Sequence, residues 1–263
     1  MKTDPWEPEQ YRRFRAERRQ PFFDLLALVR PKPQMRVVDV GCGPGELTDE
    51  LHRRLGARET VGIDSSEAML QEAGALAGEG LSFRRQDIAD FAPEVEAEAQ
   101  AECDLIFSNA ALHWVPDHRR LLTRLTTALA DHGQLAIQVP ANFDHVSHAT
   151  AREIAGESPF REALGGYTHS RFVLEPEDYA SLLEELGYRE QHVRLQVYPH
   201  RLASKGEVVE WLRGSLLTAY ARRLSDEMFR DFLERYRERL LPRLSDGRPF
   251  LFTFKRILFW AER

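Results

Sequence analysis

The sequence predicts an α/β protein in which a doubly wound, mostly parallel sheet of seven strands carries a helical cap. The first observation is that short apolar runs alternate with amphipathic helical segments through the first half of the chain. Such alternation implies right-handed crossovers and a parallel sheet covered on both faces. The second observation is that this alternation stops after residue 140, where longer helical segments begin. A chain of 263 residues is long enough for one domain with a sizeable core.

Five strands and their helices are expected in the first half. Short apolar runs indicate the strands, which are expected at 37–40, 60–63, 81–85, 104–107 and 133–139. Helical periodicity indicates the helices, which are expected at 7–29, around the stripe Leu47, Leu51 and Leu55, at 66–77, and around the stripe Leu121, Leu125 and Leu129. Segment 92–102, rich in Ala and Glu, is expected to form a loop or short helix.

The second half is expected to supply the last two strands and the cap. A helix is predicted over 176–186, because Pro176 stands at its start and Gly187 just past its end. Residues 192–198 and 250–260 are predicted to be strands. The long helical block 204–244 lies between them and is expected to cap the carboxyl edge of the sheet.

The composition limits the kinds of partner and the cellular location that we expect. Lys and Arg number 36 against 42 Asp and Glu, so the net charge of −6 disfavours nucleic acid as the main ligand. No apolar run reaches the ~18 residues of a membrane span, and the first residues lack the apolar stretch of a signal peptide. Cys42 and Cys103 lack CxxC spacing, which suits a reducing cytoplasm. We expect a cytoplasmic protein, a monomer or weak dimer, with no metal.

Glycines or polar residues follow the first four expected strands. The first strand runs into the turn 39–45, Asp-Val-Gly-Cys-Gly-Pro-Gly, whose glycines let a ligand approach the backbone. The second ends in Asp64, the third in Asp87 and Ile88, and the fourth in Asn109. Ligands of open α/β sheets bind at this edge, so we expect one shared ligand. Asp64 is placed to accept from ribose hydroxyls, and Asp87 to meet an adenine amine.

The glycine spacing indicates which ligand to expect. Gly-x-Gly-x-Gly at 41–45 differs from the dinucleotide fingerprint Gly-x-Gly-x-x-Gly. With an Asp before the first glycine, a pyrophosphate is not the expected ligand. A nicotinamide-dependent oxidoreductase is therefore the distant alternative.

Residues 35–140 resemble the class I S-adenosylmethionine-dependent methyltransferases. The resemblance rests on the turn 39–45, Asp64, Asp87-Ile88 and the stretch 107–114, Phe-Ser-Asn-Ala-Ala-Leu-His-Trp. It implies a Rossmann-like fold that binds S-adenosylmethionine and releases S-adenosylhomocysteine. The expected cofactor-binding residues in this region are Asp39, Gly41, Gly43, Asp64, Ser65, Met69, Asp87, Ile88 and Asn109. Met69 is either a cover for the adenine or a core residue.

A narrower resemblance, to the trans-aconitate 2-methyltransferases, covers nearly the whole chain. It rests on Trp6-Glu7-Pro8, Gly62-Ile63-Asp64-Ser65-Ser66, His113-Trp114-Val115-Pro116-Asp117-His118, Phe232-Leu233 and Arg235-Tyr236. It implies an N-terminal lid at 1–30, a cofactor-binding core at 31–140, and cap helices with the final two strands at 141–263. In the lid it implies that Tyr11 and Arg18 bind the cofactor, Arg18 at its methionine carboxylate, and that Trp6 faces the substrate.

The activity that this resemblance implies is esterification of a carboxylate of a small organic acid such as trans-aconitate. A carboxylate is ionised at neutral pH and needs no general base, but it needs cations, for which arginine is best suited. The candidate substrate contacts are Tyr167, Arg171, Arg213, Tyr220 and Arg256. The resemblance leads us to expect a Gly-Leu-Arg-Pro stretch near the substrate, but residues 214–217 read Gly-Ser-Leu-Leu, so an arginine expected there is absent. Another small acid or hydroxyl as acceptor, or a cofactor-binding regulator without turnover, is the alternative.

His113 and Trp114 are the expected catalytic residues, because they follow the fourth strand near the expected position of the methyl group. His113 acts as a base for a hydroxyl, as a donor to a carboxylate, or as a structural cap of the loop. Trp114 either lies against the sulfonium through cation–π attraction or packs in the core.

Overall fold

The computed structural model describes residues 15–91 and 103–263, with side chains from Arg19 onward in the first helix. The chain forms two compact units, which we call the sheet unit and the helical unit. The sheet unit comprises Ala16–Pro140, Phe172–Gln196 and Arg256–Arg263. The helical unit comprises Met1–Arg15, Ala141–Arg171 and Val197–Lys255, and its first segment lies almost wholly outside the described residues. After residue 140 the chain therefore returns twice to the sheet unit.

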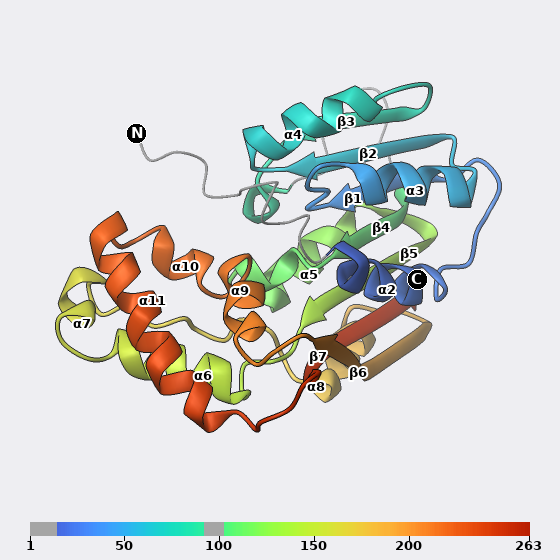
Figure 1. Ribbon diagram of the computed structural model, residues 1–263. Helices are drawn as coiled ribbons and strands as arrows, with labels where there is room; N and C mark the ends of the chain where they lie inside the picture. The colour runs from blue at the N-terminus through green and yellow to red at the C-terminus, as the bar shows by residue number, and fades with distance from the viewer. Residues whose placement is uncertain (1–14, 92–102) are drawn as a thin grey trace. The chain divides into compact units, whose positions relative to one another are not determined.

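One sheet of seven strands, in the order β3-β2-β1-β4-β5-β7-β6, confirms the predicted doubly wound sheet (Figure 1). The strands are β1 (Arg36–Val40), β2 (Glu59–Asp64), β3 (Leu81–Arg85), β4 (Cys103–Asn109), β5 (Leu129–Pro140), β6 (Glu190–Leu202) and β7 (Phe250–Glu262). β1 to β5 pair in parallel, whereas β7 runs antiparallel to β5. The carboxyl ends of β1 to β5 therefore share one edge of the sheet, the ligand edge.

Helices of the sheet unit cover both faces of the sheet. They are α2 (Arg15–Leu26), α3 (Glu46–Leu55), α4 (Glu67–Ala73), α5 (His118–Thr127) and α8 (Pro176–Glu185). Phe22 of α2 packs edge-on against Phe107 of β4, with 5.3 Å between ring centroids. Tyr179 of α8 stacks on Phe259 of β7 at 4.6 Å. Phe107 and Phe259 pair with consecutive residues of β5, so α2 and α8 pack on opposite faces.

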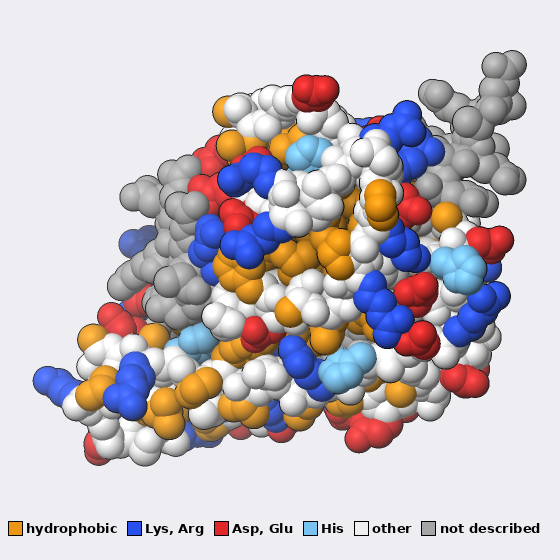
Figure 2. All heavy atoms as spheres, turned by 90° about the vertical axis from the view of Figure 1, so that its right-hand side faces the viewer, with side chains coloured by type: hydrophobic (Ala, Val, Ile, Leu, Met, Phe, Trp, Pro, Cys, Tyr) orange, Lys and Arg blue, Asp and Glu red, His pale blue; other side chains and the backbone are white. Residues whose placement is uncertain are grey.

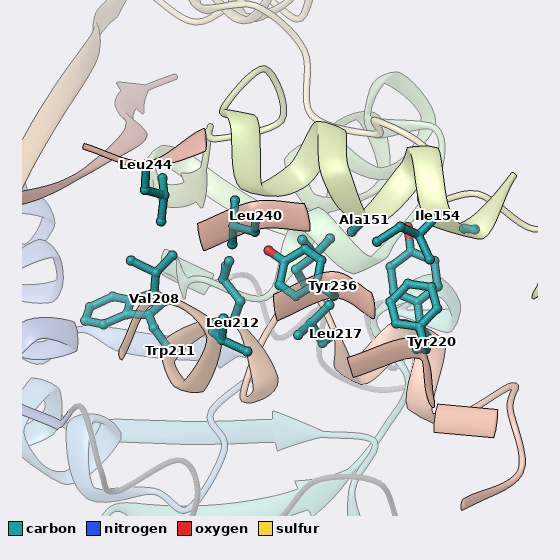
Figure 3. Packing of buried hydrophobic residues seen from close by; sticks show 14 of the residues in the cluster. Ala151, Ile154, Val208, Trp211, Leu212, Leu217, Tyr220, Tyr236, Leu240 and Leu244 are labelled. Atoms are coloured by element: carbon teal, nitrogen blue, oxygen red, sulfur yellow. The ribbon is translucent and has the colours of Figure 1, made fainter. Parts of the chain in front are cut away.

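The helical unit is built around a hydrophobic core in which aliphatic and aromatic side chains pack together (Figure 3). Its helices are α6 (Val146–Ala155), α7 (Phe160–Ala163), α9 (Glu207–Arg213), α10 (Thr218–Ala221) and α11 (Asp226–Leu240). Phe232 packs against Phe160 at 5.2 Å and against Tyr220 at 4.9 Å between ring centroids. The Tyr236 hydroxyl donates to the backbone oxygen of Ser147 at 3.0 Å. Phe232, Tyr236 and Leu240 follow one another at four-residue spacing on α11 and are fully buried, so this apolar stripe serves packing.

The expected helical block 204–244 is divided into α9, α10, α11 and the 3₁₀ turn η4 (Leu241–Arg243). Gly214 stands at the end of α9, and Ser225 caps α11 by accepting from the Met228 amide at 3.2 Å. These two residues end one helix and begin another, although the hydrophobic periodicity continues through the whole block. The expected helix 66–77 likewise ends as α4 at Ala73 and continues as the 3₁₀ turn η1 (Gly74–Leu76).

Several predicted strands are longer than their apolar runs. The strand predicted at 133–139 extends over Leu129–Pro140, and the one at 192–198 over Glu190–Leu202. The predicted helix 176–186 is confirmed as α8. The helix expected from residue 7 is described from Arg15 and ends at Leu26. The prediction for 92–102 lies outside the described residues.

Candidate functional site

The glycine turn after β1 needs its glycines for two different reasons. Gly41, Gly43 and Gly45 have φ of 81°, 56° and 81°, in the left-handed region that glycine adopts without strain. A Cβ at Gly41 would overlap the Cβ of Ala111, which follows β4. A Cβ at Gly43 would meet no atom within 4 Å. The turn thus packs tightly at Gly41 and leaves open space at Gly43.

Asp64, at the end of β2, holds this turn in place. Its Oδ2 accepts a hydrogen bond from the Gly43 amide at 2.9 Å, and its Oδ1 accepts from the Ser66 amide at 2.9 Å. Ser66 in turn caps α4 by accepting from the Met69 amide at 3.2 Å. The carboxylate therefore joins the end of β1 to the start of α4.

Asp39 lies beneath the turn, with 4% of its surface exposed. Its Oδ2 accepts from the Thr48 hydroxyl of α3 at 2.6 Å. Burial raises the pKa of Asp39 to about 7, the Thr48 hydrogen bond opposes this shift, and the nearby charge of Asp64 adds to it. Asp39 thus fastens β1 to α3 and supports the turn from the protein interior.

The ends of β3 and β4 contribute the remaining residues of this edge. Ile88 opens the 3₁₀ turn η2 (Ile88–Asp90), and its Cδ1 lies 3.5 Å from where a Gly41 Cβ would stand. Asp87 is exposed and caps η2 by accepting from the Ala89 amide at 2.8 Å. Asn109 ends β4, and its Oδ1 is buried with no hydrogen-bond partner among the described residues.

The structure therefore brings the predicted residues Gly41, Gly43, Asp64 and Ile88 into one contiguous group. Ser65 is exposed next to Asp64, whereas Met69 is 3% exposed and packs in the core. The predictions for Trp6 and Tyr11, and for the side chain of Arg18, fall outside the described residues.

His113 and Trp114 lie on the 3₁₀ turn η3 (Leu112–Trp114), directly after β4. Their rings are tilted by 42° with 4.7 Å between centroids, and both side chains are half-buried. The Trp114 amide donates to the Ala111 oxygen at 3.2 Å, so this turn is tied to the residue that packs on Gly41.

The predicted substrate residues fall into both units. Arg256, in the sheet unit, is 5% exposed and donates through Nη1 to Gln138 Oε1 at 3.1 Å. Gln138 was not among the sequence-based candidates, and its only sequence signal is a polar residue inside a buried strand.

The other substrate candidates belong to the helical unit. The Arg223 guanidinium lies 3.7 Å from the ring centroid of Tyr167. Tyr220 is fully buried, and its hydroxyl accepts from the His169 amide at 3.3 Å. Arg171 is exposed, and Arg213, also exposed, pairs with Glu210 at 3.3 Å.

Three further observations concern partners. Within residues 15–91 and 103–263, no helix is long and apolar enough to cross a membrane. In the same ranges no group of three or more His, Cys, Asp or Glu side chains is arranged to hold a metal ion. On the face drawn in Figure 2, acidic and basic side chains are interspersed.

Comparisons with known proteins agree with this arrangement. Residues 11–193 match a family described as a methyltransferase domain. Trans-aconitate 2-methyltransferase of Deinococcus radiodurans is 41% identical over 98% of both chains. The protein of the same name from Mycobacterium tuberculosis is 35% identical over 98% of this chain and 96% of the relative.

Solved structures share the fold. The YcgJ protein of Bacillus subtilis superposes with a TM-score of 0.59 at 14% identity, covering 93% of this chain and 98% of that one. Phosphoethanolamine N-methyltransferase 2 of Haemonchus contortus, in complex with S-adenosyl-L-methionine, gives 0.54 at 15% identity, covering 93% and 52%.

The sheet and these similarities define an S-adenosylmethionine-dependent methyltransferase, which confirms the predicted class of enzyme and its cofactor. The nicotinamide-dependent alternative has no support in the comparisons. Within this class, the chain belongs to the trans-aconitate 2-methyltransferase family.

The first prediction concerns Asp64. Asp64→Ala removes the acceptor of the Gly43 amide and the expected ribose contact. We expect affinity for S-adenosylhomocysteine, measured by calorimetry, to fall by about 1–3 kcal/mol, the range for losing a buried hydrogen-bond partner. Glu67→Ala, which removes an exposed carboxylate nearby, should bind like wild type. Unchanged affinity in folded Asp64→Ala protein would place Asp64 away from the cofactor.

The second prediction concerns Asp39 and pH. Because its folded pKa of about 7 exceeds the ordinary 3.8, the folded protein binds this proton more tightly than the unfolded chain. Its contribution to stability is therefore present below about pH 4 and lost as pH rises to about 7, a change of about 4 kcal/mol.

Asp39→Asn should accordingly be more stable than wild type at pH 8, with the difference vanishing towards pH 4. Urea unfolding at both pH values measures this. Asp131→Asn, at an exposed position of β5, is the control. Parallel pH profiles for Asp39→Asn and wild type would show that Asp39 ionises normally.

Proposed function

We propose that this enzyme transfers a methyl group to a carboxylate of trans-aconitate or of a closely related small acid. The observation that carries the proposal is the 41% identity over 98% of both chains to the trans-aconitate 2-methyltransferase of Deinococcus radiodurans. Arg256 supports it, because a guanidinium that is 5% exposed at the ligand edge suits an anionic acceptor.

Gly43, Asp64 and Ile88 are the proposed centre of the cofactor site. Asp64 accepts from the Gly43 amide through Oδ2 and from the Ser66 amide through Oδ1. A carboxylate oxygen accepts more than one hydrogen bond, so a carboxylate at this position suits ribose hydroxyls. The open space at Gly43 leaves the backbone accessible, and half-buried Ile88 offers an apolar surface for adenine. S-adenosylmethionine held there supplies a methyl group already activated by a sulfonium. Asn109 Oδ1, a buried acceptor without a partner in the described chain, suits its ammonium group.

The residues around the methyl acceptor have to bind and orient it and to exclude water. A carboxylate is ionised at neutral pH, so no residue has to remove a proton from it. Arg256 offsets its charge and can present two N–H groups to it. We assign His113 as a donor that orients the acceptor, with Trp114 against its ring. Alignment of this kind contributes up to about 7–11 kcal/mol to lowering a barrier.

Several sequence-based expectations stay predictions. These are the cytoplasmic location, the monomeric or weakly dimeric state, the lack of a nucleic-acid partner, and substrate contacts of Tyr167, Arg171, Arg213 and Tyr220.

The proposal is tested with a labelled methyl donor and a panel of acids. The panel contains trans-aconitate, its cis isomer, saturated tricarboxylates and hydroxylated monoacids. We expect label in trans-aconitate that mild alkali releases, as from a methyl ester. Alkali-stable label would indicate a hydroxyl acceptor, and no incorporation into any acid would favour a regulatory cofactor-binding protein.

A further inference from the structure

Strand β5 carries a pair of buried glutamines on one face of the sheet. Gln134 and Gln138 are both 0% exposed. They stand four residues apart, so their side chains project from the same face of the strand. On the neighbouring strand β4, Gln134 pairs with Leu105 and Gln138 pairs with Asn109. The same residue type therefore occupies two comparable environments, which makes their hydrogen bonding directly comparable.

Gln134 has partners for both ends of its amide. Its Oε1 accepts from the Arg30 amide at 2.8 Å and from Trp260 Nε1 at 2.8 Å. Its Nε2 donates to the Arg30 oxygen at 2.7 Å. This glutamine links β5 to β7 and to the segment after α2, and its role is structural.

Gln138 is bonded at one end only. Its Oε1 accepts from Arg256 Nη1 at 3.1 Å, which fixes the orientation of the amide. Its Nε2 is buried and has no hydrogen-bond partner among the described residues. A buried donor without an acceptor costs folding free energy, and a ligand that supplies an acceptor at this position would recover that cost.

The position of Gln138 indicates which ligand supplies that acceptor. The proposed cofactor residues Gly43 and Asp64 follow β1 and β2, and β4 separates β1 from β5. Two strand spacings amount to ~10 Å, so Gln138 lies beyond the nucleoside end of the cofactor site. Arg256 pairs with Pro140, two residues after Gln138, at the same edge of the sheet. The Nε2 group of Gln138 therefore lies on the side of the ligand edge where we expect the substrate that receives the methyl group.

A carboxylate fits the chemistry of this position. Gln138 Nε2 offers an N–H beside the guanidinium of Arg256, and Arg256 is itself held by the other end of the same amide. A carboxylate has two oxygens that accept, and its charge is offset by the guanidinium. A hydroxyl acceptor would offer no charge to offset.

We propose that Gln138 is a positioning and specificity residue whose Nε2 donates to a carboxylate oxygen of the methyl acceptor, next to Arg256. The inference rests on the proposed function, since it takes a small acid as the acceptor.

The test compares Gln138→Leu with Gln134→Leu. Binding of trans-aconitate to the S-adenosylhomocysteine complex is measured by calorimetry, and turnover with labelled donor gives KM and kcat. For Gln138→Leu we expect about 10- to 100-fold weaker acid binding and a similar rise in KM, the range for losing a hydrogen bond to a charged group. Affinity for S-adenosylhomocysteine should stay within twofold. Tm should fall less than in Gln134→Leu, because Gln138 accepts one hydrogen bond, from Arg256, whereas Gln134 makes three.

Gln134→Leu should lower Tm by more and leave acid affinity and KM unchanged. Gln138→Glu places a carboxylate beside Arg256 and should weaken acid binding further. Gln138→Met, similar in volume, serves if the leucine variant does not fold, and should weaken acid binding in the same way as leucine.

Three outcomes overturn the inference. Wild-type acid affinity in both Gln138→Leu and Gln138→Met would mean that the donor holds only water. Equal loss of acid and S-adenosylhomocysteine affinity would make Gln138 a cofactor residue. An acid that does not bind wild type at all would remove both this inference and the proposed function. Acid binding that depends on Gln138 without any methyl transfer would overturn the proposed function alone.

Discussion

The carboxylate of Asp64 is the interaction on which the ligand edge depends. One of its oxygens accepts from Gly43 and the other from Ser66, so a single side chain sets the glycine turn and the start of α4. Glycines alone permit many turn conformations, and a fixed acceptor selects one of them. Asp39, buried beneath the same turn, accepts from the Thr48 hydroxyl and so fastens β1 to α3. Two carboxylates, one half-buried and one fully enclosed, thus shape the same turn by different means.

The class of sheet and the parallel direction of its first strands could be predicted from the sequence, because each buried strand is a short apolar run and each crossover an amphipathic helix. The order of the strands comes from the structure. The boundaries could not be predicted. The block 204–244 is periodic throughout, but Gly214 and the Ser225 cap divide it, and the weight of such local signals depends on what the helices pack against. β5 extends beyond its apolar run because Leu129 pairs with Cys103 ahead of a register shift and Pro140 pairs with Arg256 at the other end.

The candidate site was predictable where residues follow strands directly, as Gly43 and Asp64 do, because the carboxyl ends of parallel strands meet at one edge. The site could not be predicted where it depends on contacts between residues that are far apart in the sequence. Gln138 and Arg256 are 118 residues apart, and only the register between β5 and β7 brings them together. Tyr220 illustrates a second difficulty. A buried aromatic residue at helical spacing has the same sequence pattern whether it packs in a core or contacts a ligand.

The discontinuous course of the chain limits how this enzyme can be remodelled. Residues 172–196, with α8 and the first part of β6, separate the two described segments of the helical unit and belong to the sheet unit. Excising 141–255 as one block would therefore strip away Tyr179 and uncover Phe259 on one face of the sheet. The helical unit is not a cassette that recombination can exchange whole. An exchange of this unit has to replace 141–171 and 197–255 separately and keep 172–196 in place.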